Sequence, residues 1–295
     1  MPKNRTRDRQ LAKLAARRQA ERHAVKRRRG IMLGMVGAVV AVVLVAIGFR
    51  VLTDDEAATA TPTPSDSAIP TVAPGAEPTV TGEVTPLVEP PSEVACGAEA
   101  PKGAGEAKPQ FDRAPGVDSL DPAVTYRATI ETSCGTIDVE LDAARAPQTV
   151  ASFVFLAREG YFDGLTFHRV VPGFVVQAGD PRGDGIGGPG YEFPDELGGR
   201  MRYDEGVVAM ANSGPNTNGS QWFIVSGPDG ANLDDIPNYT IFGNVREGMD
   251  VVAAIEAVPI GAGDVPSQAV YIERVTIEER EAPPSEGGAP ASESP

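Results

Sequence analysis

Histidine, cysteine and tryptophan are scarce in this 295-residue chain, which holds two His, two Cys and one Trp. Structural zinc sites are built from four Cys or His ligands, so two Cys with no His nearby make a poor zinc site. The signatures H-E-x-x-H, G-x-S-x-G and G-x-x-x-x-G-K-[ST] are also missing. The sequence therefore lacks the motifs of zinc proteases, α/β-hydrolases and P-loop nucleotide-binding proteins.

One glycine-rich stretch does fit a nucleotide-binding pattern. Residues 183–188 read G-D-G-I-G-G, which matches the dinucleotide fingerprint G-x-G-x-x-G. That fingerprint has to open a helix, whereas Pro189 and Gly190 follow directly here. We therefore interpret the stretch as a flexible loop and reject a dinucleotide site.

Basic residues are few outside the amino terminus. Residues 1–30 hold 12 Lys or Arg and two acidic side chains, and the rest of the chain has 14 basic and 39 acidic side chains. Nucleic-acid-binding domains present a basic face to the phosphate backbone. The acidic body of the chain therefore argues against a nucleic-acid partner.

A single long apolar run occupies residues 31–49, where 19 consecutive residues carry no charge. A helix of about 20 residues crosses a hydrocarbon core of roughly 30 Å, and positively charged flanks stay on the cytoplasmic side. Because three arginines precede the run, we predict a single-pass cell-membrane protein. It would have a basic cytoplasmic arm at 1–30, a transmembrane helix at 31–49 and an extracytoplasmic remainder. The alternative is a cleaved signal peptide, whose apolar core is usually ~7–15 residues long.

Large apolar side chains are sparse in residues 53–122, which are rich in Pro, Ala and Thr. Such a composition buries too little apolar surface to offset the entropy of ordering. We predict a disordered linker there and a disordered acidic tail at 281–295. Cys96 and Cys134 lie beyond the proposed membrane, where disulfides persist in an oxidising compartment. We favour a bridge between them, and two free thiols are the alternative.

Residues 123–280 show a different pattern, with short segments of alternating polarity between turn residues. Helices are predicted at 146–160, where Pro147 suits the first turn, and at 248–257. Eight strands are predicted by the same criteria, at 126–132, 136–141, 166–171, 174–178, 206–211, 221–225, 240–245 and 271–277. This pattern indicates a mainly β domain, a closed eight-stranded antiparallel barrel capped by two helices.

One predicted strand carries a histidine and an arginine side by side, in 166-TFHRVVPGFVVQAGD-180. Neighbouring side chains of a strand point to opposite faces of the sheet. His168 is the only candidate base in the domain, and we interpret it as a packed structural residue. Arg169 then faces the other way, where a buried guanidinium needs acceptors or a substrate. The same alternation in 219-GSQWFIV-225 puts Gln221 and Phe223 on one face.

Three long motifs, FHRVVPGFVVQAGD, GIGGPGYEFPDE and GVVAMANSGPNTNGSQWFIV, occur in this order. Over residues 124–279, about half of the chain, the sequence resembles the cyclophilin family of peptidyl-prolyl cis–trans isomerases. The resemblance implies an eight-stranded barrel with a helix at each end. It also implies an enzyme that acts on proline-containing polypeptides and needs neither metal nor cofactor. With the predicted anchor, it indicates a membrane-anchored bacterial form that acts on secreted or envelope proteins.

The resemblance also assigns roles to individual residues. Arg169 would donate a hydrogen bond to the prolyl nitrogen of a twisted transition state, and Phe174 and Gln177 would complete the catalytic set. The substrate-binding residues would be Gly185, Ala211, Asn212, Ser213, Gln221, Phe223, Leu233 and Tyr239.

Four positions depart from the family pattern. Asn232 stands where many members have a tryptophan that contributes to cyclosporin binding, so we expect cyclosporin to bind weakly. Tyr239, Val175 and Ala178 replace the family's usual His, Met and Gly. These changes are expected to alter affinity and sequence preference more than activity. Two other hypotheses remain: a proline-binding chaperone or scaffold that needs no turnover, and a chain whose basic arm is the functional part.

Overall fold

The structure is a computed structural model that describes residues 77–199 and 201–281. The predicted basic arm at 1–30, the transmembrane helix at 31–49 and the tail after residue 281 lie outside the described residues, as does the first part of the predicted linker. Among the residues that are described, no helix is both long and apolar enough to span a membrane.

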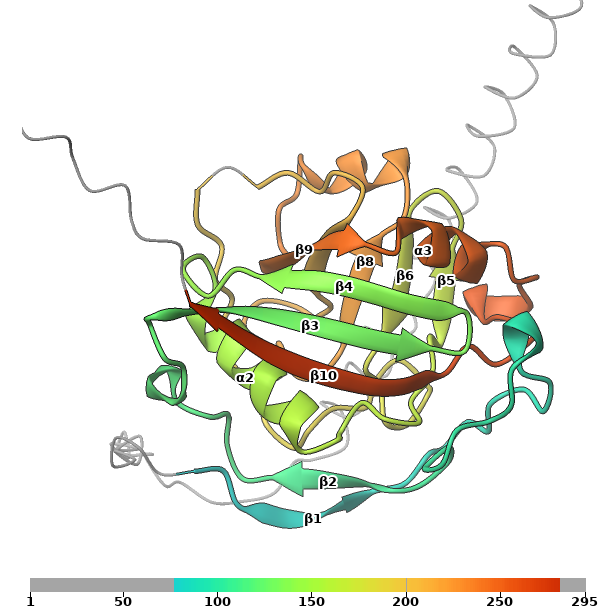
Figure 1. The fold of residues 1–295 in the computed structure, drawn as a ribbon, viewed down its shortest axis with the longest axis horizontal. Coiled ribbons are helices and arrows are strands. Elements are labelled where there is room, and N and C mark those ends of the chain that lie inside the picture. Colours follow the sequence, from blue (N-terminus) through green and yellow to red (C-terminus); the bar gives the residue numbers. More distant parts are fainter. Residues whose placement is uncertain (1–76, 200, 282–295) are drawn as a thin grey trace, which may run out of the picture. The chain divides into compact units, whose positions relative to one another are not determined.

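Eight antiparallel strands form one curled sheet around the main core (Figure 1). Their order in the sheet is β10-β3-β4-β9-β7-β8-β6-β5. The strands are β3 (Val124–Thr132), β4 (Gly135–Leu141), β5 (Arg169–Val171), β6 (Val175–Ala178), β7 (Val207–Met210), β8 (Trp222–Val225), β9 (Ile241–Glu247) and β10 (Ile272–Glu281). All eight predicted strands are confirmed.

The prediction of a closed barrel is wrong, because the strands at the two ends of the sheet, β5 and β10, do not pair with each other. β5 contains only three residues, since Pro172 and Gly173 turn the chain directly after it. The segment before β5 meets the start of β10 and the residues just before it: Phe167 N donates to Val270 O at 2.9 Å, and Ile272 N donates to Leu165 O at 2.8 Å. The seam is therefore crossed by a few backbone bonds and has no continuous ladder.

Two helices, α2 (Pro147–Arg158) and α3 (Met249–Glu256), lie where they were predicted. Pro147 occupies the first turn of α2, where its missing N–H has no helical partner to lose. α2 packs against β10 (Figure 1). From α2, Phe153 reaches the fully buried Trp222, with ring centroids 6.1 Å apart in an edge-on arrangement. Phe162 and Phe167 meet the same indole edge-on, so the barrel interior is filled by aromatic rings.

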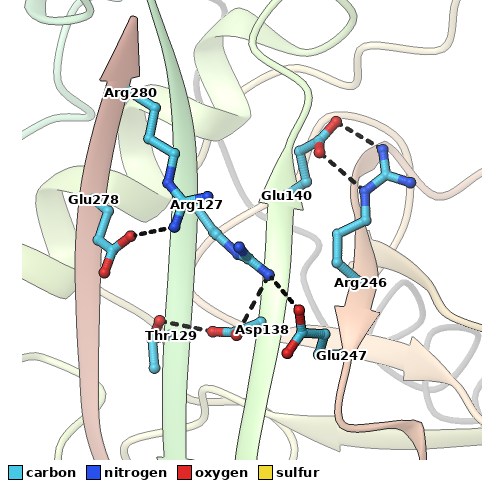
Figure 2. A network of polar contacts seen from close by, with 8 residues as sticks. All are labelled: Arg127, Thr129, Asp138, Glu140, Arg246, Glu247, Glu278 and Arg280. Atoms are coloured by element: carbon cyan, nitrogen blue, oxygen red, sulfur yellow. Dashed lines mark hydrogen bonds and ion pairs between the residues drawn. The ribbon is translucent and has the colours of Figure 1, made fainter.

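On β3, β4 and β10 the opposite face of the sheet is polar, whereas on β6, β7 and β8 it carries a second cluster of buried apolar residues, among them Val175, Ala209 and Phe223. Along β3 the residues Tyr126, Ala128, Ile130 and Thr132 are buried while those between them are not. On the outer face Arg127 lies 3.4 Å from Asp138 and 3.6 Å from Glu247. Figure 2 shows this contact network, which also contains Thr129–Asp138, Glu140–Arg246 and Glu278–Arg280. Exposed ion pairs contribute about 0–1 kcal/mol each, so the buried face stabilises the sheet more than this network does.

The prediction of a disordered linker is wrong for residues 77–122, which are ordered against the domain. They form β1 (Val80–Val84), η1 (Ala95–Gly97), β2 (Lys108–Phe111) and η2 (Val117–Ser119). β1 and β2 pair as a separate two-stranded ribbon beside the barrel (Figure 1), called the ribbon below. Ala95 is fully buried, and Phe111 is 2% exposed with its ring edge-on to Phe155 at 4.8 Å. A few apolar residues thus suffice for order when a folded surface is there to receive them.

A disulfide joins Cys96 to Cys134 across 38 positions of sequence. It ties η1 to the turn between β3 and β4. The favoured bridge is confirmed, and neither cysteine is free. It pins the end of the predicted linker to the domain, as expected.

Candidate active site

Cross-strand pairing assembles the candidate site on neighbouring strands. Arg169 on β5 is the direct partner of Gln177 on β6, and Gln177 is the partner of Phe223 on β8. Residues that face each other across antiparallel strands project from the same face of the sheet. The guanidinium, the amide and the aromatic ring therefore form one row, although 54 positions of sequence separate its ends.

A chain of hydrogen bonds orients the polar members of this row. Arg169 Nη1 donates to Gln177 Oε1 at 3.3 Å, and Gln177 Nε2 donates to Gln221 Oε1 at 3.0 Å. Gln221 Nε2 donates in turn to Gly187 O at 2.8 Å. Because each amide has its oxygen and nitrogen committed, neither can flip without breaking bonds on both sides. The side chain of Arg169 is 38% exposed, so its remaining donors are open to a ligand.

Asp264 faces the other side of the arginine, with its Oδ2 atom 3.6 Å from Arg169 Nε. It ends η4 (Ala262–Asp264) in the left-handed region, with φ of 63°. Asp264 was not among the residues predicted from the sequence. A lone aspartate in a glycine-containing loop carries no signal that it would reach an arginine nearly a hundred positions away.

A cavity of about 120 Å³ opens beside Arg169 and is bounded mainly by apolar side chains. Leu233 comes from the end of η3 (Pro228–Leu233), and Tyr239 packs edge-on against Phe223 at 5.5 Å. Tyr203 holds Tyr239 in place, since its hydroxyl donates to Tyr239 O at 2.7 Å. The residues that line this cavity are Arg169, Phe174, Val175, Gln177, Ala211, Asn212, Phe223, Leu233 and Tyr239.

A second, larger cavity of about 580 Å³ adjoins the first and shares Gln177, Ala211 and Asn212 with it. It contains the other predicted substrate-binding residues, Gly185, Ser213 and Gln221. Every predicted site residue therefore lines one cavity or the other, while the roles assigned to them stay predictions. The second cavity also contains Val84 and Gln110 from the ribbon, which the sequence analysis had placed in a disordered linker.

The loop between β7 and β8, which borders both cavities, is closed by its own side chains. Ser213 N donates to Thr217 Oγ1 at 2.9 Å, and Thr217 Oγ1 donates to Gly214 O at 2.8 Å. Asn212 Nδ2 reaches Asn238 O at 2.8 Å. This loop thus presents backbone groups to the cavities from a fixed position.

His168 lies apart from the row that contains Arg169. It is 8% exposed, and neither ring nitrogen has a hydrogen-bond partner within the described ranges. Burial lowers the pKa of His168 below its ordinary value, although Asp180 acts in the opposite direction. The interpretation of His168 as a packed residue is confirmed.

Known proteins that resemble this chain match it over most of the residues that form the sheet and the two cavities. The sequence model of the family described as cyclophilin type peptidyl-prolyl cis-trans isomerase/CLD matches residues 127–277. Peptidyl-prolyl cis-trans isomerase A of Mycobacterium tuberculosis is 41% identical over 174 residues, which are 53% of this chain and 94% of that protein. Peptidyl-prolyl cis-trans isomerase-like 1 of Gibberella zeae is 40% identical over 162 residues, 54% of this chain and 98% of the other.

A longer relative from Arabidopsis thaliana, also named a peptidyl-prolyl cis-trans isomerase, is 40% identical over 195 residues. These residues are 61% of this chain and 30% of the relative, so the chain spans less than a third of that protein's length.

Proposed function

Because the chain belongs to the family of cyclophilin-type peptidyl-prolyl cis-trans isomerases, we propose that its domain accelerates rotation about X-Pro peptide bonds. The observation that carries the proposal is the row of Arg169, Gln177 and Phe223 beside a cavity whose lining combines apolar side chains with polar groups. The cavity offers the proline ring an apolar surface, and the row offers a cationic donor beside it.

The chemistry follows from the electronic structure of the peptide bond. Rotation is opposed by a barrier of ~18–20 kcal/mol, because the nitrogen lone pair is delocalised into the carbonyl. In the twisted transition state this nitrogen becomes pyramidal and accepts a hydrogen bond. A donor aimed at it stabilises the twisted form more than either planar isomer, which is the condition for catalysis.

Arg169 supplies that donor. A guanidinium has five N–H groups, of which Gln177 takes one and the ion pair with Asp264 orients another. A hydrogen bond from a charged donor contributes about 1.5–3 kcal/mol, or roughly 10- to 100-fold in rate. The rest of the acceleration comes from holding one side of the bond in the larger cavity while the other side turns. The mechanism moves no proton, so His168 takes no part in it.

The cellular setting is a proposal of its own: a domain tethered outside the cytoplasm, acting on secreted or envelope proteins. It is supported by the apolar run at 31–49 behind a basic flank. The Cys96–Cys134 disulfide also supports it, since such bonds persist mainly in oxidising compartments. Protease added to intact cells should remove the domain, and full protection of the domain would contradict this setting.

The decisive test of the activity is prolyl isomerisation of a short X-Pro peptide by residues 77–281, comparing wild type with Arg169→Ala. We expect kcat/KM to fall at least about tenfold, the loss of one charged hydrogen bond. Arg280→Ala is the matched control, since this exposed arginine on β10 forms an ion pair with Glu278 and with no other residue that the structure describes. It should retain the wild-type rate. If both proteins bind the peptide equally and neither accelerates isomerisation, the domain is a proline-recognition module.

A further inference from the structure

One wall of the larger cavity is formed by the ribbon, which lies outside the residues that match the family model. Val84 on β1 and Gln110 on β2 line the cavity together with the loop 185–192, whereas the family model begins at residue 127. Val84 pairs with Lys108, and Gln110 lies two residues further along β2. Val84 and Gln110 both line the cavity, while Lys108 and Phe111 at the two ends of β2 are buried.

Hydrogen bonds hold the ribbon at this place as a fixed wall. Gln110 Nε2 donates to Gly188 O at 2.7 Å and Phe111 N donates to Pro189 O at 2.8 Å. Lys108, which is nearly buried, donates to Asp163 O. Gly190 permits the close approach, because it has φ of +95° and a Cβ there would lie 2.7 Å from Phe111 O.

The groups that this wall presents are hydrogen-bond acceptors beside apolar surface. The Oε1 atom of Gln110 accepts no hydrogen bond from any described residue. Glu192 is exposed and forms no ion pair within 77–199 and 201–281. The one cationic lining residue, Arg182, is already paired with Asp184 at 2.7 Å. Val84 and the 73% exposed Ile186 add apolar contact area.

A lysine or arginine side chain matches such a surface. Its aliphatic stem lies along apolar groups while its charged end donates only hydrogen bonds. The charge of the molecule acts in the same direction, since the chain after residue 30 holds 14 basic and 39 acidic side chains. An acidic surface raises the local concentration of cationic ligands.

We propose that the ribbon completes the substrate groove and makes it selective for polypeptides with a lysine or arginine within a few residues of the proline. Gln110 and Glu192 accept hydrogen bonds from that side chain, and Val84 contacts its stem. This inference rests on the proposed isomerase function and adds the class of substrate. It assigns a binding role to a segment that the family match does not include.

The test uses proline peptides of one sequence with lysine, norleucine or glutamate placed in turn at each of the three positions before and after the proline. Norleucine keeps the stem of lysine and lacks its charge. With the full chain we expect kcat/KM for lysine to exceed that for norleucine by about three- to fivefold at one or two positions, as for other exposed charged contacts. Glutamate should be the poorest of the three, and higher salt should reduce the differences.

Two variants locate the preference. Gln110→Ala and Glu192→Gln should each reduce the lysine-to-norleucine ratio, and the double variant should bring it close to one. Gln268→Ala is the matched control, because Gln268 lines neither of the two cavities, and it should leave the ratio unchanged. The inference is overturned if no position favours lysine, or if the ratio is the same in Gln110→Ala and wild type. Acceleration of the norleucine peptides in that case would leave the isomerase function standing, whereas no acceleration of any peptide would overturn both proposals.

Discussion

Two neighbouring residues, His168 and Arg169, lie in different surroundings. The histidine is 8% exposed and packed, while the arginine is 38% exposed and aligned with Gln177. His168 directly precedes β5, whereas Arg169 is the first residue of that strand and pairs with Gln177. The neutral imidazole is the less costly to bury, because a buried guanidinium without acceptors keeps its full charge.

The burial of His168 predicts a pH-dependent term in stability. Its pKa is lowered in the folded protein, mainly by burial, so the unfolded chain binds a proton more readily. The contribution of His168 to the free energy of unfolding should therefore be complete above about pH 6.5, the ordinary pKa of histidine in an unfolded chain. It should decrease as the pH drops below that value. Asp180 and Asp184 oppose this shift, and Arg169 adds to it.

The measurement is urea unfolding at pH 7.5 and pH 5.5 for wild type and His168→Gln. The variant should lose less free energy of unfolding than wild type between the two pH values, because it has no buried imidazole that must take up a proton. Carboxylates elsewhere titrate equally in both proteins and cancel in the comparison. Identical losses would show that His168 is not held neutral by the fold.

At the scale of single elements, the ribbon and η1 depend on their connections to the barrel. The ribbon has only two strands, and an isolated two-stranded hairpin is marginally stable in water. Its order comes from the burial of Phe111 and from the bond that Phe111 N donates to Pro189 O. The segment after β1 is held by bonds from Leu87 N and Val88 N to Arg182 O, and η1 by the Cys96–Cys134 bridge.

Removal of the disulfide should destabilise the domain strongly. The bridge spans 38 positions of sequence, for which the loop-entropy relation gives about 4 kcal/mol. We expect Cys96→Ser combined with Cys134→Ser to lower the free energy of unfolding by about 2–4 kcal/mol in a urea titration. Wild type treated with a reductant should show the same loss. A change under about 1 kcal/mol would mean that hydrogen bonds and packing alone hold η1.

For the whole molecule, the folded unit is larger than the family match, because it begins before residue 127 and includes at least residues 77–122. Phe111 joins the same core cluster as the residues of α2, the helix that packs against β10. The domain boundary that the composition indicated, residue 123, therefore cuts through the core.

A fragment that begins at residue 123 should consequently be much less stable than residues 77–281. Phe111→Ala provides the scale: this side chain is 2% exposed, and truncating a buried phenylalanine costs about 3–5 kcal/mol. The shorter fragment should lose at least as much, as measured by thermal and urea unfolding. Val117→Ala, at a position that is 49% exposed, should change stability by less than about 0.5 kcal/mol. Equal stability of the two fragments would show that the segment merely rests on a self-sufficient barrel.

The elements with a clear period were predictable from the residues alone. The eight strands and two helices follow from alternation and from turn residues such as Pro147, which act over a few positions. The burial of His168 and the partial exposure of Arg169 also agree with the interpretation made from the sequence. The residues of the two cavities were found through long ordered motifs, since no local pattern reveals that 169 and 223 are neighbours.

Contacts between distant segments could be known only from the folded chain. Closure of the barrel depends on whether β5 and β10 meet, and their alternation is the same in an open and a closed sheet. The order of residues 77–122 depends on a surface that exists only after the barrel has formed, so the low apolar content of that segment was misleading. The position of Asp264 beside Arg169, and that of Gln110 in the second cavity, likewise depend on contacts between distant segments. Local periodicity shows which side of a strand is buried. The residue that contacts it from a distant segment is determined by the free energy of the whole fold.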